Sequence, residues 1–150
     1  MNSVASFVAV GGVIAAVGGV IATVWGVGKA VKSVDRQLQL QFFADYTKRY
    51  QEIMLQFPES INDDDFQLES LDPDRRDRTL RYMRAYFDLC SEEYYLSKHE
   101  HIDGEAWKEW ESGIKYALSK TAFEQSWERV KLNTTYYPEF VEFVALFLKK

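Results

Sequence analysis

Histidines and carboxylates gather in one short segment of the chain, which makes that segment the first place to look for metal chemistry. Residues 98–103 read KHEHID and hold both histidines, His99 and His101, with Glu100 and Asp103 beside them. A protein metal site normally draws three or four ligands from fixed positions, and no second cluster of such residues accompanies this one. We therefore interpret the segment as a surface loop between helices and expect no metal or other cofactor.

The single cysteine and a pair of adjacent glutamates are the next candidates for catalysis. Cys90 falls among apolar helix positions, where it is expected to be a small buried hydrophobe that forms no intramolecular disulfide. Glu92 and Glu93 occupy neighbouring helix positions and so point about 100° apart, which suits no two-carboxylate mechanism. An enzyme would require Cys90 or a histidine to meet carboxylates in space.

Known catalytic motifs are missing from the sequence. There is no Glu-x-x-His pair of a di-iron bundle, no His-Glu-x-x-His of a zinc peptidase, no phosphate-binding loop and no dinucleotide glycine fingerprint. The run Asp63, Asp64 and Asp65 lacks the alternating ligand spacing of a calcium loop and is interpreted as a solvated charge run. We therefore expect no enzyme activity.

Charge is divided unevenly along the 150 residues. The 18 Lys and Arg and the 23 Asp and Glu give a net charge of −5, which does not favour nucleic-acid binding. All of them lie at or after Lys29, and the stretch from Val4 to Gly28 is uncharged. A helix of that length spans about 37 Å, more than the roughly 30 Å of a bilayer core. Residues 1–30 are therefore predicted to be a transmembrane anchor, with Trp25, Lys29 and Lys32 at the membrane interface.

The charges that flank this stretch predict its orientation. Lys29, Lys32 and Arg36 follow it, whereas only the terminal amine precedes it. The positive-inside rule then places the N-terminus outside and residues 31–150 in the cytoplasm, as a single-pass protein of the bacterial inner membrane.

Small residues form a seam along this predicted anchor, in the manner of a glycine zipper. Small side chains let helix backbones approach closely in lipid, so the seam predicts a homo-oligomer. A second small row about 100° away favours a closed ring over a pair, because a ring needs two contact faces. The first row comprises Ala5, Ala9, Gly12, Ala16, Gly19, Thr23, Gly26 and Ala30, and the second Gly11, Ala15, Gly18 and Ala22.

The rest of the chain is predicted to be all-α, an antiparallel bundle of four to five helices with an aromatic core. A helix continues from the anchor to Phe57, where Pro58 ends it. Residues 58–72 form an acidic connection, which we expect to pair with five arginines in the next helix. Further helices begin at Asp72 with Pro73, after Asp103, at the capping-box pair Thr121 and Glu124, and at Pro138. Inward apolar stripes are expected at Phe43, Tyr46, Tyr50, Ile53, Met54 and Phe57; Leu80, Met83, Phe87, Cys90 and Tyr94; Trp107, Trp110, Ile114 and Leu118; Phe123, Trp127 and Val130; and Phe140, Phe143, Val144 and Phe147.

Three segments resemble known families. The stretches FFADYTKRYQEI (42–53), RYMRAYFDLCSEEYYL (81–96) and WKEWESGI (107–114) resemble parts of uncharacterised bacterial single-pass membrane proteins with domains of unknown function. The architecture also resembles the HEPN-like accessory proteins of RNA-targeting CRISPR systems, which form membrane rings. The HEPN nuclease motif would require Arg at positions 92–97, where the chain has EEYYLS, so the resemblance implies no nuclease activity.

These observations lead to one expected function and one alternative. The expected function is assembly, as a homo-oligomeric membrane scaffold or pore whose partners are its own copies and the lipid bilayer. The alternative is a monomeric membrane tether whose helical domain binds a cytosolic protein.

Overall fold

The structure is a computed structural model that describes residues 31–148. The chain divides into two units, Met1–Leu40 and Gln41–Lys150, and residues 31–40 of the first unit are helical. The second unit opens with helical residues 41–54, called the first helix below. It continues with two 3-10 helices, η1 (Glu59–Asn62) and η2 (Leu68–Ser70), and with α2 (Pro73–Lys98), α3 (Gly104–Leu118), α4 (Thr121–Val130) and α5 (Pro138–Leu148). No strand occurs between residues 31 and 148, so the prediction of an all-α fold is confirmed for them.

Local signals in the sequence place most helix starts correctly. At α2 the Asp72 side chain accepts a hydrogen bond from the backbone N–H of Arg75, and Pro73 occupies the first helical position. At α3 the Asp103 side chain accepts from the backbone N–H of Glu105. Both contacts satisfy backbone donors that a helix start otherwise leaves unpaired. The fifth helix begins at Pro138, as predicted.

Two helix boundaries differ from prediction. The cap of α4 is Lys120 and no side chain caps it, because the Thr121 hydroxyl instead donates to the carbonyl oxygen of Asp64, 3.3 Å away. The first helix ends at residue 54 rather than at Phe57. Its last turn tightens through a bond from the Phe57 N–H to the Met54 carbonyl, and the residue before a proline avoids helical geometry.

The acidic connection of residues 58–72 contributes to the core, which its charge did not predict. Ile61, Phe66 and Leu68 are buried there, on or next to the two 3-10 helices. Its carboxylates pair with the region of α4: Asp64 with Lys120 at 2.9 Å, and Glu69 with Arg129. Of the five arginines of α2, Arg75 forms an ion pair with an aspartate of the connection, its own cap Asp72. The other expected pairings do not occur among the described residues.

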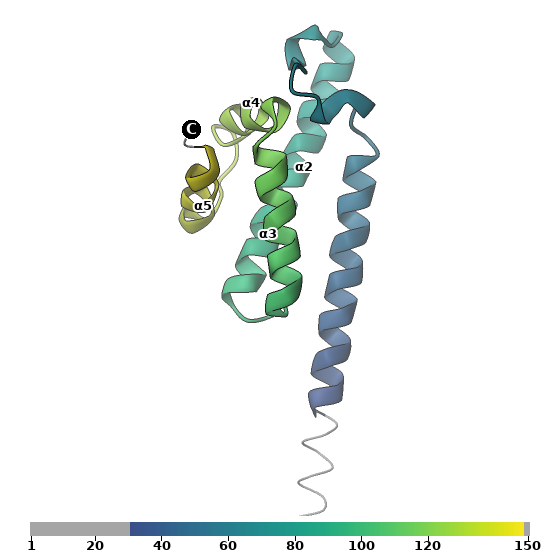
Figure 1. Cartoon of the computed structure of the whole chain (residues 1–150), viewed down its shortest axis with the longest axis vertical. Helices are drawn as coiled ribbons and strands as arrows, with labels where there is room; N and C mark the ends of the chain where they lie inside the picture. The colour runs from purple at the N-terminus through teal and green to yellow at the C-terminus, as the bar shows by residue number, and fades with distance from the viewer. Residues whose placement is uncertain (1–30, 149–150) are drawn as a thin grey trace, which may run out of the picture. The chain divides into compact units, whose positions relative to one another are not determined.

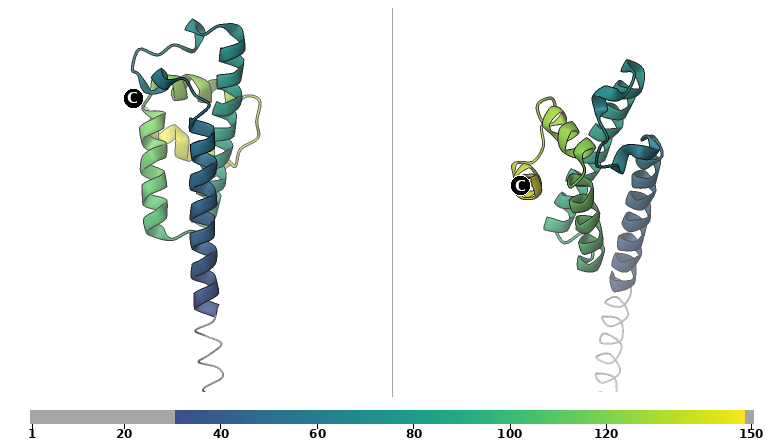
Figure 2. Two further views of the ribbon diagram at one scale, coloured as in Figure 1. Left: turned by 90° about the vertical axis from the view of Figure 1, so that its right-hand side faces the viewer. Right: turned by 45° about the horizontal axis from the view of Figure 1, so that its top comes forward.

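Three helices run alongside one another in the second unit. The first helix runs antiparallel to α2, and α2 antiparallel to α3, while α5 lies on the far side of α2 and α3 from the first helix (Figures 1 and 2). The predicted aromatic core is confirmed at its centre, where the Trp127 ring meets Phe87 at 5.0 Å and Phe140 at 5.8 Å between ring centroids. Phe43 and Tyr50 are only partly covered, at 42% exposed each.

The predicted membrane localisation is contradicted and is not retained. None of the helices in residues 31–148 has both the length and the apolar character needed to cross a bilayer. Residues 31–54, for example, carry seven charged side chains: Lys32, Asp35, Arg36, Asp45, Lys48, Arg49 and Glu52. The predicted span itself, residues 1–30, lies outside the described residues, and so do both small rows, Trp25 and Lys29. Lys32, predicted at a membrane interface, is an exposed helical residue.

Candidate functional site

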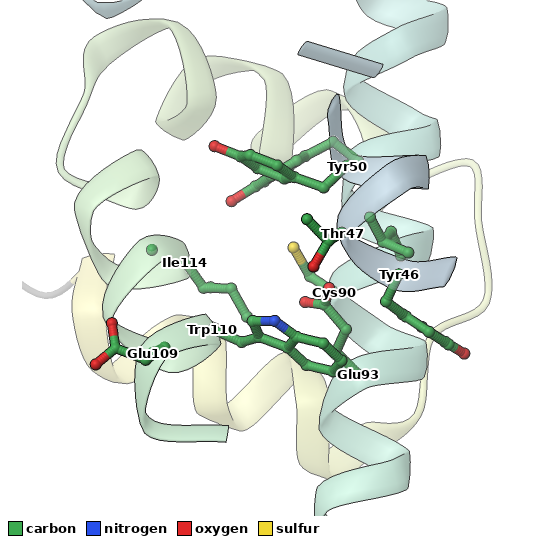
Figure 3. A pocket seen from close by; sticks show the side chains of 11 residues that line it. Tyr46, Thr47, Tyr50, Cys90, Glu93, Glu109, Trp110 and Ile114 are labelled. Atoms are coloured by element: carbon green, nitrogen blue, oxygen red, sulfur yellow. The ribbon is translucent and has the colours of Figure 1, made fainter. Parts of the chain in front are cut away.

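A cavity of about 240 Å³ lies between the first helix, α2 and α3 (Figure 3). Each helix supplies a face at helical spacing, because residues three and four apart lie on one side of a helix. The wall comprises Tyr46, Thr47 and Tyr50 from the first helix; Tyr86, Leu89, Cys90 and Glu93 from α2; and Glu109, Trp110, Gly113 and Ile114 from α3.

Aromatic rings close one side of the cavity. The Trp110 ring stacks on Phe43 and Tyr46 of the first helix, with centroid distances of 5.8 and 5.5 Å. Tyr50 and Tyr86 meet at 6.4 Å, and Tyr86 continues into the core through Phe123. The site is thus held by ring packing between helices, which fixes the positions of the polar groups among the rings.

The Glu93 carboxyl is the unusual group in this cavity. The residue is 5% exposed, and its carboxyl opens onto the cavity. Burial raises the pKa of Glu93 to about 8, the Arg49 charge lowers it, and the Glu92 charge raises it. A carboxyl with little access to water prefers its neutral form. Glu93 is therefore mostly protonated at neutral pH, and its carboxyl gains and loses its proton in the pH range around 8.

Cys90 lies beside Glu93 and also faces the cavity (Figure 3). Cys90 is 2% exposed. Burial raises the pKa of its thiol well above the ordinary value, and the Glu93 charge raises it further. The predicted burial of Cys90 is confirmed. Reactive cysteines have the opposite environment, in which positive neighbours stabilise the thiolate.

Two tyrosines complete the polar lining around Glu93. Burial raises the pKa of Tyr86 and of Tyr50, and the charges of Cys90 and Glu93 raise both further. The Thr47 hydroxyl lies toward the middle of the cavity in Figure 3, whereas the Glu109 carboxyl points away from it. The cavity therefore offers several neutral hydrogen-bonding groups and one ionisable carboxyl on an aromatic wall.

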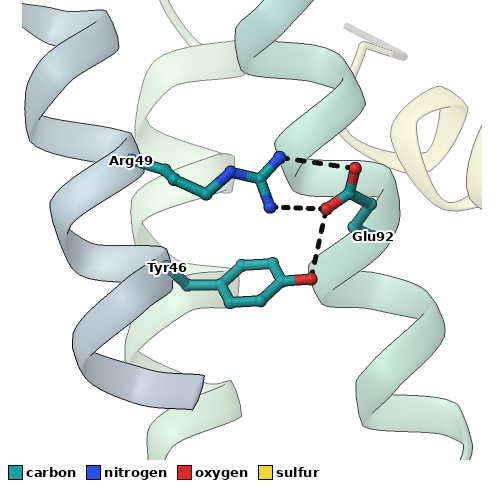
Figure 4. Close-up of polar contacts among 3 residues, drawn as sticks. All are labelled: Tyr46, Arg49 and Glu92. Carbon is teal, nitrogen blue, oxygen red and sulfur yellow. Dashed lines mark hydrogen bonds and ion pairs between the residues drawn. The ribbon is translucent and has the colours of Figure 1, made fainter. Parts of the chain in front are cut away.

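Glu92, one position before Glu93, belongs to a different cluster at the surface (Figure 4). Arg49 donates to its two carboxylate oxygens at 2.7 and 3.4 Å, and the Tyr46 hydroxyl donates to one of them at 3.1 Å. The Arg49 guanidinium also lies 5.1 Å from the centre of the Tyr46 ring. The predicted divergence of Glu92 and Glu93 is confirmed, since one is exposed and paired and the other buried.

The two histidines lie away from the cavity, at the end of α2. Both are exposed, and the His99 ring lies 4.2 Å from that of Tyr95. The His101 N–H bonds to the carbonyl of Leu96 while Glu100 takes a positive φ of 57°, a common way for a helix to end. Within residues 31–148 no three His, Cys, Asp or Glu side chains are placed to hold a metal ion.

Sequence reasoning assigned five of the wall residues to the core and considered Glu93 only as half of a carboxylate pair with Glu92, not as a site residue. A signal was present: Glu93 follows Tyr86 by seven residues and Cys90 by three, so it falls on the buried face of α2. A charged residue on an apolar stripe marks a candidate site.

No protein-family model, no curated protein and no solved structure matches this chain.

Proposed function

We propose that the helical unit of residues 41–150 is a small-molecule-binding module that does not catalyse a reaction. The observation that supports this is a cavity of about 240 Å³ between three helices, into which the Glu93 carboxyl opens from an aromatic and aliphatic wall. Glutamate is rarely as buried as this, and a carboxyl with a shifted pKa in a cleft marks a candidate functional site. A concave apolar pocket with a few convergent polar groups is the usual form of a ligand site.

Binding is favoured over catalysis because the cavity lacks an activated nucleophile. Cys90 meets a carboxyl there, as an enzyme would require, but burial holds the thiol protonated. The histidines, which could serve as bases, are not part of the wall. We expect native Cys90 to resist alkylation by iodoacetamide at pH 8 and to react only after unfolding, as measured by mass spectrometry. Rapid alkylation of the folded protein would instead support a catalytic cysteine.

A fragment screen on the purified full chain tests the binding function. Ligands should shift the indole N–H resonance of Trp110, assigned through a Trp110→Phe variant. Gly113 lines the cavity, and a Cβ there would meet nothing within 4 Å, so side chains of different size can be introduced. Gly113→Leu should fill the cavity and abolish binding, whereas the matched Gly113→Ala should retain it. Binding that survives Gly113→Leu, or a screen without ligands, would contradict the proposal.

A second candidate function is assembly of copies of the chain, and one feature of the first unit favours it. Val31, Val34 and Leu38 are exposed at three- and four-residue spacing, the pattern of a helix-pairing seam. The small-residue rows predicted to drive assembly lie outside the described residues. Substituting Val34→Gln with Leu38→Gln should reduce a multimer to single copies in native mass spectrometry. Arg36→Gln, about 200° around the helix from Leu38, is the matched control. A single-copy mass for the unsubstituted chain would contradict assembly and leave the seam to a different protein partner.

A further inference from the structure

The cavity between the first helix, α2 and α3 has a marked charge preference. The carboxyl of Glu93 faces it, the carboxyl of Glu109 points away from it (Figure 3), and no Lys, Arg or His is among the described residues that line it. The nearest guanidinium, Arg49, is engaged by Glu92 outside the cavity. An anionic ligand would meet only like or neutral groups here, so the electrostatics favour a cation or a neutral molecule.

The rest of the wall distinguishes between kinds of cation. A metal ion needs several oxygen, nitrogen or sulfur ligands, and residues 31–148 contain no group of three suitable side chains. The cavity instead presents ring surfaces from Tyr50, Tyr86 and Trp110 and aliphatic surfaces from Leu89 and Ile114. Aromatic faces attract organic cations, and apolar walls bind their hydrocarbon part.

We propose that this cavity binds a small organic ammonium ion, with the ammonium group on the Glu93 carboxylate and the hydrocarbon part against the rings of Tyr50, Tyr86 and Trp110. This inference rests on the proposed binding function and names its ligand class. A volume of about 240 Å³ lies below the 300–1,000 Å³ usual for drug-sized ligands and matches a small amine.

Binding of an ammonium ion requires a proton balance. Free Glu93 is protonated below about pH 8, so the ammonium displaces the carboxyl proton to the buffer as the ion pair forms. Affinity should therefore rise about tenfold per pH unit well below pH 8, provided that the amine remains charged. The titratable or charged groups around Glu93 are Tyr46, Arg49 and Tyr50 from the first helix and Tyr86, Cys90 and Glu92 from α2, while the Glu109 carboxyl of α3 points away from the cavity (Figure 3).

Isothermal titration calorimetry on the full chain with three matched probes tests this inference. The probes are benzylammonium, benzyl alcohol and benzoate, which share a ring and differ in charge. We expect benzylammonium to bind about fivefold more tightly at pH 8 than at pH 7, since about a tenth of Glu93 is ionised at pH 7 and half at pH 8, and to release close to one proton at pH 7. Benzyl alcohol should bind at least tenfold more weakly at pH 8, and benzoate should not bind.

Two single-residue variants locate the effect. Glu93→Gln keeps the shape of the carboxyl but not its charge, and it should lose benzylammonium binding at least tenfold while remaining folded by circular dichroism. Glu92→Gln, the neighbour outside the cavity, should retain binding. If benzyl alcohol binds as tightly as benzylammonium, or if Glu93→Gln binds both equally, the ammonium inference is overturned while the binding function stands. If the broader fragment screen also finds no ligand, both are overturned.

Discussion

Glu92 and Glu93 are consecutive residues of α2 with the same side chain, yet they lie in opposite environments. The Glu92 side chain is 46% exposed and pairs with Arg49 through two contacts. Glu93 is 5% exposed and faces a cavity. The difference arises from the helix itself, which turns each successive side chain by about 100°.

The comparison indicates which carboxyl serves structure and which serves a ligand. An exposed pair such as that of Glu92 and Arg49 contributes at most about 1 kcal/mol, and its loss leaves no buried charge. The buried Glu93 is costly when ionised, and the Arg49 charge offsets that cost only in part, since burial still raises the pKa to about 8. Arg49 forms its ion pair with Glu92 at the surface and not with Glu93. The Glu93 carboxyl therefore remains available to a ligand.

The largest expected effect is on stability at high pH in Glu93→Gln. Unfolded glutamate ionises near 4.5 and folded Glu93 near 8, so between these values the folded state holds a proton that the unfolded state lacks. The contribution of the Glu93 carboxyl to the free energy of unfolding is fully present below pH 4.5 and is lost as pH rises through about 8. Because each pKa unit corresponds to about 1.4 kcal/mol and the two pKa values are about 4.5 and about 8, Glu93→Gln should gain on the order of 5 kcal/mol at pH 9 relative to the parent.

Urea denaturation at pH 5 and pH 9 measures this gain. The difference between variant and parent should be small at pH 5 and large at pH 9. Glu92→Gln is the matched control, and it should change stability by less than about 1 kcal/mol at both values. An equal effect of Glu93→Gln at the two pH values would show that the Glu93 carboxyl is solvated.

Opening the cavity to water should make Glu93 resemble an exposed carboxyl. Trp110→Ala removes a ring stacked on Phe43 and Tyr46, with an expected loss of about 2 kcal/mol, and it should lower the pKa of Glu93 toward 4.5. Trp107→Ala is the control, because Trp107 packs on Tyr94 and Phe143 away from the cavity. It should cost similar stability in thermal unfolding and leave the Glu93 titration unchanged in NMR.

The smallest effects should come from breaking the surface pair, and their signs should differ. Arg49 lowers the pKa of Glu93 and Glu92 raises it, so Arg49→Gln should move the Glu93 midpoint up and Glu92→Gln should move it down. Both variants should lose less than about 1 kcal/mol, since the pair is exposed. NMR titration of the two variants in parallel gives the signs, and shifts in the same direction would contradict this electrostatic account.

The sequence predicted helices well where local chemistry determines them. Asp72, Asp103 and Pro138 mark helix starts through caps and proline geometry, which depend on neighbouring residues alone. Thr121 failed as a cap because the Asp64 carbonyl, distant in sequence, takes its hydroxyl hydrogen. The burial of Ile61, Phe66 and Leu68 in the acidic connection was not predicted. These apolar residues are few and are separated by charged ones, so they form no recognisable periodic pattern.

The candidate site was less predictable because it depends on the packing of three helices. Spacing alone shows that Glu92 and Glu93 diverge, but not which of them faces α3. That depends on the ring of Trp110 meeting Phe43 and Tyr46 across the interface. Periodicity assigned Tyr46, Tyr50 and Trp110 to the core, since it cannot distinguish a filled interface from one that leaves about 240 Å³ open.

The most direct test of this account is the titration of the Glu93 side chain in the unliganded full chain. Its carboxyl carbon can be followed by NMR in protein labelled with ¹³C at glutamate, with Glu93→Gln identifying the resonance. The account predicts a midpoint of about 8. A midpoint near 4.5 would mean that the carboxyl is solvated or strongly paired, and would contradict the claim that it lies buried at a ligand cavity.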